Sequence, residues 1–167
     1  LGLAIATMHG VDPAGCGAGT FGRLGIARVV HSAELVAAAL PEHSRTALGL
    51  ARDLAAGEPP AEARVLLHGD CHPKNALAEP DGLALIDLDQ GALGAAAADI
   101  GSLLARLRHG SIVGAHDRTV GEGLARAFLD GYARVRALPH PDSLRWHTAA
   151  ALVAERAIRA VNRVNRP

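Results

Sequence analysis

Hydrophobic residues recur along most of this chain at the spacing of helices. Apolar positions three or four residues apart predict helices from the beginning of the chain to its end. The predicted helical segments are 1–9, 23–40, 42–56, a helix opened by Asp99, 117–136, and a long final helix that is capped by Asp142 or Ser143 and runs through Val164. In the helix that Asp99 opens, apolar residues repeat at i, i+3, i+4 and i+7 from Ile100 to Leu107 and form one face.

Three short apolar runs in the middle of the chain lack the helical period and predict strands. Residues 64–67 are bounded by turn signals, as is typical of a buried strand. Residues 75–78 and 83–86 flank the turn sequence Glu-Pro-Asp-Gly and predict a β-hairpin. The hairpin would bring Asn75 and Asp87 close together, because residues just outside paired strands remain neighbours across the ladder.

Two glycine-rich segments are interpreted as loops. The first, Val11 to Gly22, contains Gly17-x-Gly19-x-x-Gly22, a spacing found in dinucleotide-binding loops. That pattern requires a preceding strand, and a helix precedes it here, so we favour an ordinary interhelical loop. The Gly/Ala-rich segment between the hairpin and Asp99 is the second predicted loop.

Length and composition indicate one helical domain. With 167 residues, of which 49% are hydrophobic, the chain is long enough for one substantial core. Abundant Ala and Leu, with only 2% aromatic residues, favour helices packed on helices. We therefore predict a single domain over 1–167, mainly α with a small β-hairpin (α+β).

Charge and cysteine content exclude several classes of partner. The 17 basic and 17 acidic residues cancel, so no net field favours nucleic acid or an anionic membrane. No apolar run reaches the roughly 18 residues of a spanning helix, and no signal peptide is visible. Two cysteines, Cys16 and Cys71, are too few for a disulfide framework, so we predict a cytoplasmic protein. The chain begins inside a helical pattern without methionine, and we expect the beginning of the natural protein to be missing.

An aspartate, an asparagine and a second aspartate surround the predicted hairpin. Asp70 precedes Asn75 by five residues, and Asp87 follows a dozen residues later. Phosphoryl transfer from a nucleotide needs this arrangement: one carboxylate takes the proton of the attacking hydroxyl, while amide and carboxylate oxygens hold Mg²⁺ against the phosphates. Each residue alone is more readily a turn or strand-end residue, but together they favour a catalytic site.

Three motifs in this region resemble a known enzyme family. They are His68-Gly69-Asp70-x-His72-Pro73-x-Asn75, Ile86-Asp87-x-Asp89 and Asp99-Ile100-Gly101. They resemble the C-terminal catalytic lobe of the aminoglycoside phosphotransferase and choline kinase-like family, which has a protein-kinase-like fold. The resemblance implies that Asp70 is the catalytic base, that Asn75 and Asp87 hold Mg²⁺ and ATP, and that Asp89 is an outer-sphere or second-metal ligand.

The resemblance also implies supporting roles for neighbouring residues. His68 opens the family's loop and sets its backbone, and the residue matching Asp99 holds the loop through hydrogen bonds. A plain helix N-cap is an equally physical role for Asp99. His72 stays open between loop support and substrate contact, and Cys71 is expected to be a buried thiol rather than a nucleophile.

The chain departs from the family pattern in three places. Lys74 replaces a common glycine, and Gly94-Ala95-Ala96 stands where many relatives carry Gly-Asp-Pro, so an acidic group that can support the loop is absent. The N-terminal lobe, with its phosphate-covering loop and its lysine, is missing. We expect a C-terminal lobe only, with Leu1 to Gly10 as the first helix after the interlobe hinge.

By this resemblance the predicted function is ATP-dependent transfer of the γ-phosphoryl group to a hydroxyl of a small molecule, such as an aminoglycoside or a sugar. The alternative is a non-catalytic or truncated kinase-like binding module, since the missing lobe carries half of the nucleotide contacts. A metallophosphatase site at Gly69-Asp70-x-His72 would need further metal-ligand clusters, which the sequence lacks. Zinc bound by His68, Cys71 and His72 is disfavoured because such close neighbours do not converge easily on one tetrahedral ion.

The acceptor is not identified by the sequence. Few aromatic residues are present to cage a quaternary ammonium, so choline is disfavoured. A cationic acceptor would need acidic groups, and the candidates by sign alone are Glu122, Asp130, Asp142 and Glu155.

Overall fold

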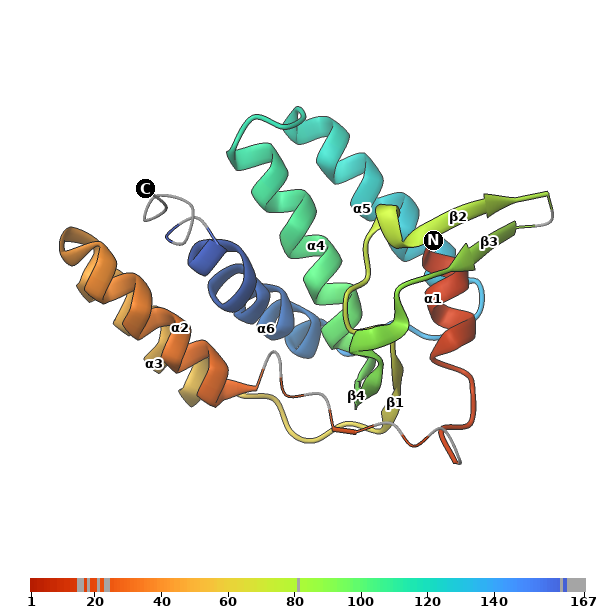
Figure 1. The fold of residues 1–167 in the computed structure, drawn as a ribbon, viewed down its shortest axis with the longest axis horizontal. Helices are drawn as coiled ribbons and strands as arrows, with labels where there is room; N and C mark the ends of the chain where they lie inside the picture. Colours follow the sequence, from red (N-terminus) through yellow and green to blue (C-terminus); the bar gives the residue numbers. More distant parts are fainter. Residues whose placement is uncertain are drawn as a thin grey trace.

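A computed structural model describes residues 1–14, 17, 19, 20, 22, 25–80, 82–159 and 161. Its helices are α1 (Gly2–Met8), α2 (Ile26–Ala39), α3 (Ser44–Ala56), α4 (Ala96–Ile112), α5 (Arg118–Ala133) and α6 (Pro141–Ala151), which continues into a π-helical segment, η4 (Leu152–Ala157). Short 3₁₀ turns are η1 (Pro41–His43), η2 (Pro73–Asn75) and η3 (Leu88–Gln90). The mainly helical fold with small β elements that the sequence predicts is confirmed (Figure 1).

Four short strands form two separate antiparallel pairs. β2 (Ala76–Glu79) and β3 (Gly82–Leu85) are the predicted hairpin, which projects from the helical body (Figure 1). β1 (Arg64–Leu67) pairs instead with β4 (Ala92–Ala95), in the segment that we predicted to be a Gly/Ala loop. That prediction was wrong because Ala and Gly have low strand propensity and carry no period of their own. The β1–β4 pair joins the two ends of segment 68–91, which contains the candidate residues before Asp99.

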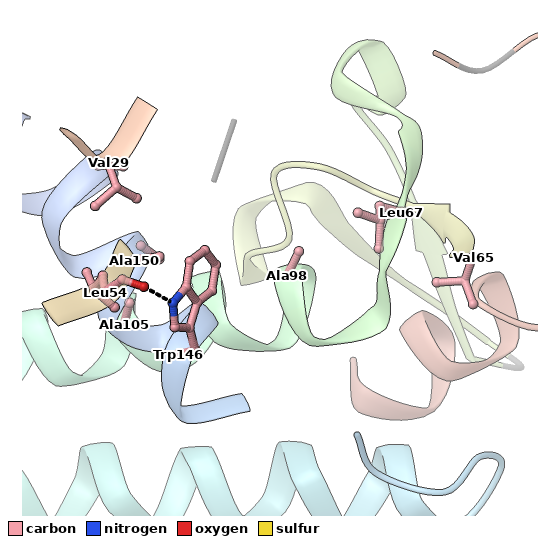
Figure 2. Packing of buried hydrophobic residues seen from close by; sticks show 10 residues of the cluster. Val29, Leu54, Val65, Leu67, Ala98, Ala105, Trp146 and Ala150 are labelled. Carbon is pink, nitrogen blue, oxygen red and sulfur yellow. Dashed lines mark hydrogen bonds between the residues drawn. The ribbon is translucent and has the colours of Figure 1, made fainter. Parts of the chain in front are cut away.

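Helix α4 lies at the centre of the molecule, packed against α5, α6 and η4. Its Ala98 and Ala105 join Trp146 of α6 in a buried cluster, where the Trp146 Nε1–H donates to the Leu54 carbonyl of α3 at 2.8 Å (Figure 2). At Gly101 a Cβ would lie 2.8 Å from backbone atoms of α6, so the two helices cross too closely for a side chain there.

A second buried cluster joins α1 and α5 to the opposite side of α4. Its members are Ile5, Ala6, Cys71, Ile100, Leu103, Phe128 and Tyr132. Ile100 and Leu103 are buried and Leu104 and Leu107 pack against the cluster, so the predicted apolar face of this helix is confirmed. Since Cys71 belongs to this cluster, the loop that carries it is fastened to the helical body.

Helix boundaries differ from prediction at several ends. α4 begins at Ala96, so Asp99 lies within its first turn and is not its N-cap. α6 begins at Pro141, and the His140 ring, rather than Asp142 or Ser143, accepts a hydrogen bond from the backbone at the helix start. The end of the final helix at Val164, and the residues Cys16, Ala18 and Phe21 of the first loop, lie outside the described residues. Within the described part of the chain, no helix has the length and apolar character needed to cross a bilayer.

Candidate active site

The loop that leaves β1 turns sharply at Gly69, which has φ +80°. A Cβ at this position would lie 2.7 Å from the carbonyl carbon of Gln90 in η3. Backbone therefore packs directly on backbone between the two arms of segment 68–91, and only glycine allows this approach.

Asp99 holds this loop from α4. Its side chain is buried, with Oδ2 accepting the backbone N–H of His68 at 2.7 Å and Oδ1 accepting that of Gly69 at 2.9 Å. A carboxylate that accepts backbone N–H groups makes charge-assisted hydrogen bonds, which are stronger than neutral ones. The first turn of α4 thereby fixes the backbone just before Asp70.

Two residues that the sequence analysis missed complete the anchor. His9, at the end of α1, places Nε2 3.1 Å from Asp99 Oδ2 and Nδ1 2.9 Å from the Tyr132 hydroxyl of α5. Burial raises the pKa of Tyr132, so this hydroxyl keeps its proton and can donate to His9. The partners are 90 and 123 residues apart in the sequence, and no local pattern connects them.

His68 lies fully buried at the head of the loop. Its Nδ1 accepts the Asp70 N–H at 3.4 Å, while its Nε2 has no hydrogen-bond partner among the described residues. Cys71 is 1% exposed, and burial raises the pKa of its thiol well above the ordinary value. The expectation that Cys71 is buried is confirmed, and a neutral thiol is a poor nucleophile.

The carboxylate of Asp70 lies between two basic side chains. Its Oδ2 is 3.5 Å from His72 Nε2, and its Oδ1 is 3.6 Å from Nη2 of Arg106 on α4. The Asp70 side chain is 23% exposed, so solvent and small molecules have access to it. Arg106 was not foreseen from the sequence, because its approach depends on where α4 lies.

His72 presents an N–H to Asp70. Its Nδ1 accepts the Lys74 N–H at 3.1 Å, so in the neutral ring Nε2 carries the proton. Burial, followed by the charge of Arg106, lowers the pKa of His72 and favours this neutral form. The Lys74 side chain itself is exposed.

The hairpin base brings the predicted metal ligands together. Asn75 is buried, and its Nδ2 donates to the Asp70 carbonyl at 3.1 Å, which leaves the amide oxygen for another partner. The Asn75 carbonyl accepts the N–H of Ile86 at 3.0 Å, so the ladder places Asn75 beside Asp87. Asp87 has φ +61° and ψ +55°, a left-handed conformation that is uncommon for a residue other than glycine and is concentrated at functional sites.

These donors fit a magnesium ion. Mg²⁺ takes oxygen ligands, keeps several waters, and is commonly held by one or two protein side chains together with substrate phosphates. Asn75 and Asp87 supply an amide and a carboxylate oxygen, and the exposed Asp89 lies in the next turn, η3. Among the described residues no group of three or more His, Cys, Asp or Glu is arranged to hold a metal ion.

Comparison with known proteins agrees with the fold and the motifs. The family profile described as "Phosphotransferase enzyme family" matches residues 1–138, a range that runs from α1 through α5 and includes the whole candidate site. A search of curated protein sequences finds no match. The crystal structure of aminoglycoside-3'-phosphotransferase of type VIII superposes with a TM-score of 0.60 and 22% sequence identity, covering 91% of this chain and 59% of that chain.

The structural neighbour is longer than this chain, which spans 59% of its length. At 22% identity the superposition establishes a shared fold, while the family profile matches the sequence itself over most of its length. The chain belongs to the phosphotransferase enzyme family.

Proposed function

We propose that this chain is the catalytic lobe of an ATP-dependent phosphotransferase that phosphorylates a hydroxyl of a small molecule. The observation that supports this most strongly is the convergence of Asp70, Asn75 and Asp87 on one segment closed by the β1–β4 pair. Asp99 fixes the same segment by accepting two backbone hydrogen bonds. Such rigid placement is what phosphoryl transfer requires, because its catalysis is mostly positioning and electrostatics.

In the proposed reaction Asp70 orients the acceptor hydroxyl and takes its proton as the oxygen attacks the γ-phosphorus. The bond between the γ-phosphorus and the β,γ-bridging oxygen breaks, and ADP leaves. Asn75 and Asp87, with Asp89 nearby, would hold Mg²⁺, which would neutralise charge on the phosphates. Asn75 also ties the metal site to the base through its hydrogen bond to the Asp70 carbonyl.

We further propose that turnover belongs to the full-length protein. In kinase-like enzymes a separate lobe supplies the phosphate-covering loop and a lysine. The greater length of the structural neighbour supports this view. That neighbour is an aminoglycoside-3'-phosphotransferase; we assign this chain the broader acceptor class of small hydroxyl compounds.

The test is Asp70→Asn in the full-length protein. Loss of the base should lower ATP turnover by roughly 10²–10⁴-fold. Mg·ATP affinity should stay within about 2-fold, because the metal ligands remain intact. Turnover is measured by ADP release and affinity by equilibrium binding, with the exposed Asp130→Asn of α5 as the matched control.

Wild-type turnover in Asp70→Asn would contradict the proposal. Binding of Mg·ATP by the wild-type protein without turnover on any hydroxyl acceptor would instead support the binding-module alternative. Asp87→Asn should weaken Mg²⁺-dependent nucleotide binding, which separates the metal role from the base role.

A further inference from the structure

The guanidinium of Arg106 forms an ion pair with Asp70 that is too long to be a hydrogen bond. The distance of 3.6 Å between Arg106 Nη2 and Asp70 Oδ1 exceeds hydrogen-bond length. The Nε–H of Arg106 is buried and has no hydrogen-bond partner within the described part of the chain, while the side chain as a whole is 29% exposed. An arginine normally uses its planar fork of donors on carboxylate or phosphate oxygens, so this side chain has binding capacity that the fold does not use.

A second arginine, Arg156, acts electrostatically on Arg106. Arg156, in η4, is 6% exposed, and its Nη2 donates to Glu155 Oε2 at 2.8 Å. Ser102 of α4 donates to the same oxygen at 2.8 Å. Glu155 is thus committed to internal partners and is a poor candidate for binding a cationic acceptor. The Arg156 Nε–H also has no hydrogen-bond partner among the residues described.

Charged groups of both signs act on Arg106. Among the described residues they include Arg156, Asp70, Arg159 and Glu155, in decreasing order of effect. Burial first, and then the charge of Arg156, lower the pKa of Arg106, yet a guanidinium remains protonated in proteins. The cationic guanidinium of Arg106 beside Asp70 disfavours an ammonium group of the acceptor at this position.

The arginines and the predicted metal ligands lie on different elements. Asn75 and Asp87 flank the β2–β3 hairpin, whereas Arg106 lies on α4 and Arg156 on the continuation of α6, and α4 and α6 lie on the side of the loop away from the hairpin (Figure 1). The phosphates would be held on the hairpin side. The helical side is therefore left for the acceptor.

We propose that Arg106, reinforced by Arg156, binds an oxyanion of the acceptor, either a carboxylate or a phosphate group. The acceptor is then an anionic hydroxyl compound rather than a cationic one. This assignment of the acceptor side rests on the proposed phosphotransferase function, but binding of the oxyanion itself requires no turnover.

The first experiment measures binding in the full-length protein without nucleotide. Inorganic phosphate and malonate are titrated separately while the ¹H–¹⁵N signals of arginine Nε–H groups are followed by NMR. Saturable shifts are expected for Arg106 and Arg156. The exposed Arg108, on the same helix, is the internal control and should not shift. The probe that binds more tightly indicates whether the acceptor oxyanion is a carboxylate or a phosphate.

Variants assign the effect to the guanidinium. Arg106→Gln should weaken oxyanion binding by about tenfold, the effect of one charge-assisted hydrogen bond. Arg106→Lys should lie between wild type and Arg106→Gln, and Arg108→Gln should match wild type. Asp70→Asn should strengthen binding, since its carboxylate no longer competes for Arg106. Arg106 signals that do not shift would overturn the inference. So would equal oxyanion affinity in wild type and Arg106→Gln, which would indicate an adventitious ion only.

The second experiment compares matched sugars that differ in charge. Glucuronate should bind more tightly than glucose, and glucose more tightly than glucosamine. In Arg106→Gln the differences in affinity between the three sugars should become smaller. Tightest binding of glucosamine overturns the oxyanion site. If oxyanions bind as expected but ATP is never consumed with any acceptor, the phosphotransferase proposal fails while the arginine site stands.

Discussion

Asp99 is the residue through which three distant parts of the chain meet. Its two carboxylate oxygens accept backbone hydrogen bonds from His68 and Gly69, and His9 reaches one of them from α1. Together these contacts require both oxygens of Asp99 to be acceptors. Asp99 thus positions Asp70 through the loop backbone and not by direct contact.

Asp99→Asn should destabilise the fold. The amide would turn an N–H₂ group toward a backbone N–H and leave a buried donor unpaired, at a cost of about 1–3 kcal/mol. Urea unfolding followed by circular dichroism measures this change. Asp117→Asn is the matched control, because Asp117 flanks α5 and makes no side-chain capping bond; it should change stability by less than about 0.5 kcal/mol. Equal stability of the two variants would contradict the anchoring role.

Gly69→Ala tests the close approach of the loop to η3. Gly69 and Gly114 both have positive φ, +80° and +72°, but only Gly69 faces backbone atoms within contact distance. Gly114→Ala should therefore cost about 1–2 kcal/mol from the conformation alone. Gly69→Ala should cost more and should lower turnover in the full-length protein, because the loop must shift away from Gln90. Similar losses in both variants would argue that the contact with Gln90 is unimportant.

Among the elements, α4 couples the candidate site to the helical body. It carries Asp99 in its first turn and Arg106 two turns later, and it packs on α5, α6 and η4. The sequence predicted this helix and its apolar face correctly, since its large aliphatic residues repeat with a clear period. It did not predict β4, the strand before α4, because small residues show neither a strand nor a helix pattern.

In the other helices the apolar residues do not all face the core. On α5, Phe128 and Tyr132 are buried, but Leu124 is 50% exposed. On α2, Val29 and Val36 are buried, while Leu35 is 43% exposed. In alanine-rich helices the contrast between faces is weak, so periodicity indicates a helix more reliably than it indicates which side is buried.

The crossing of α4 and α6 can be tested at Gly101. A Cβ there would lie 2.8 Å from the backbone of His147 and Thr148, so Gly101→Ala should separate the helices and cost about 1–3 kcal/mol. Gly123→Ala in α5 is the control, because nothing lies within 4 Å of its Cβ position. Alanine favours helix over glycine by about 1 kcal/mol, so this control should stabilise the protein. The midpoint temperature of thermal unfolding should therefore fall in Gly101→Ala and rise in Gly123→Ala. Shifts in the same direction would contradict the close crossing of α4 and α6.

At the scale of the whole molecule, the local motifs were more predictable than the contacts that support them. Asp70, Asn75 and Asp87 are close in sequence, and the hairpin that brings Asn75 to Asp87 is marked by its own turn sequence. His9 and Arg106 reach the loop only after α1 and α4 have packed, and no sequence pattern specifies that packing. The roles of the motif residues remain predictions that the substitutions above can test.

Packing of distant segments also makes the stability of the whole molecule depend on pH. His147 of α6 donates its Nδ1–H to the Ser143 carbonyl at 2.9 Å, and burial lowers the pKa of its ring from the usual 6.5. Below pH 6.5 the unfolded chain binds a proton at His147 that the folded chain does not yet bind. Stability should therefore fall as the pH decreases below that value, with a slope of at most about 1.4 kcal/mol per pH unit from this group.

Urea unfolding at several pH values between 7.5 and 5.5 measures this slope. The range extends roughly one pH unit to either side of the pKa of a free imidazole. His72 has its pKa lowered in the same direction, so a part of the slope should remain in His147→Gln. His43, exposed in η1, provides the matched control: its ring contacts solvent before and after unfolding, and His43→Gln should retain the wild-type slope. A slope unchanged in His147→Gln would show that protonation of His147 is not coupled to folding, and would contradict the prediction.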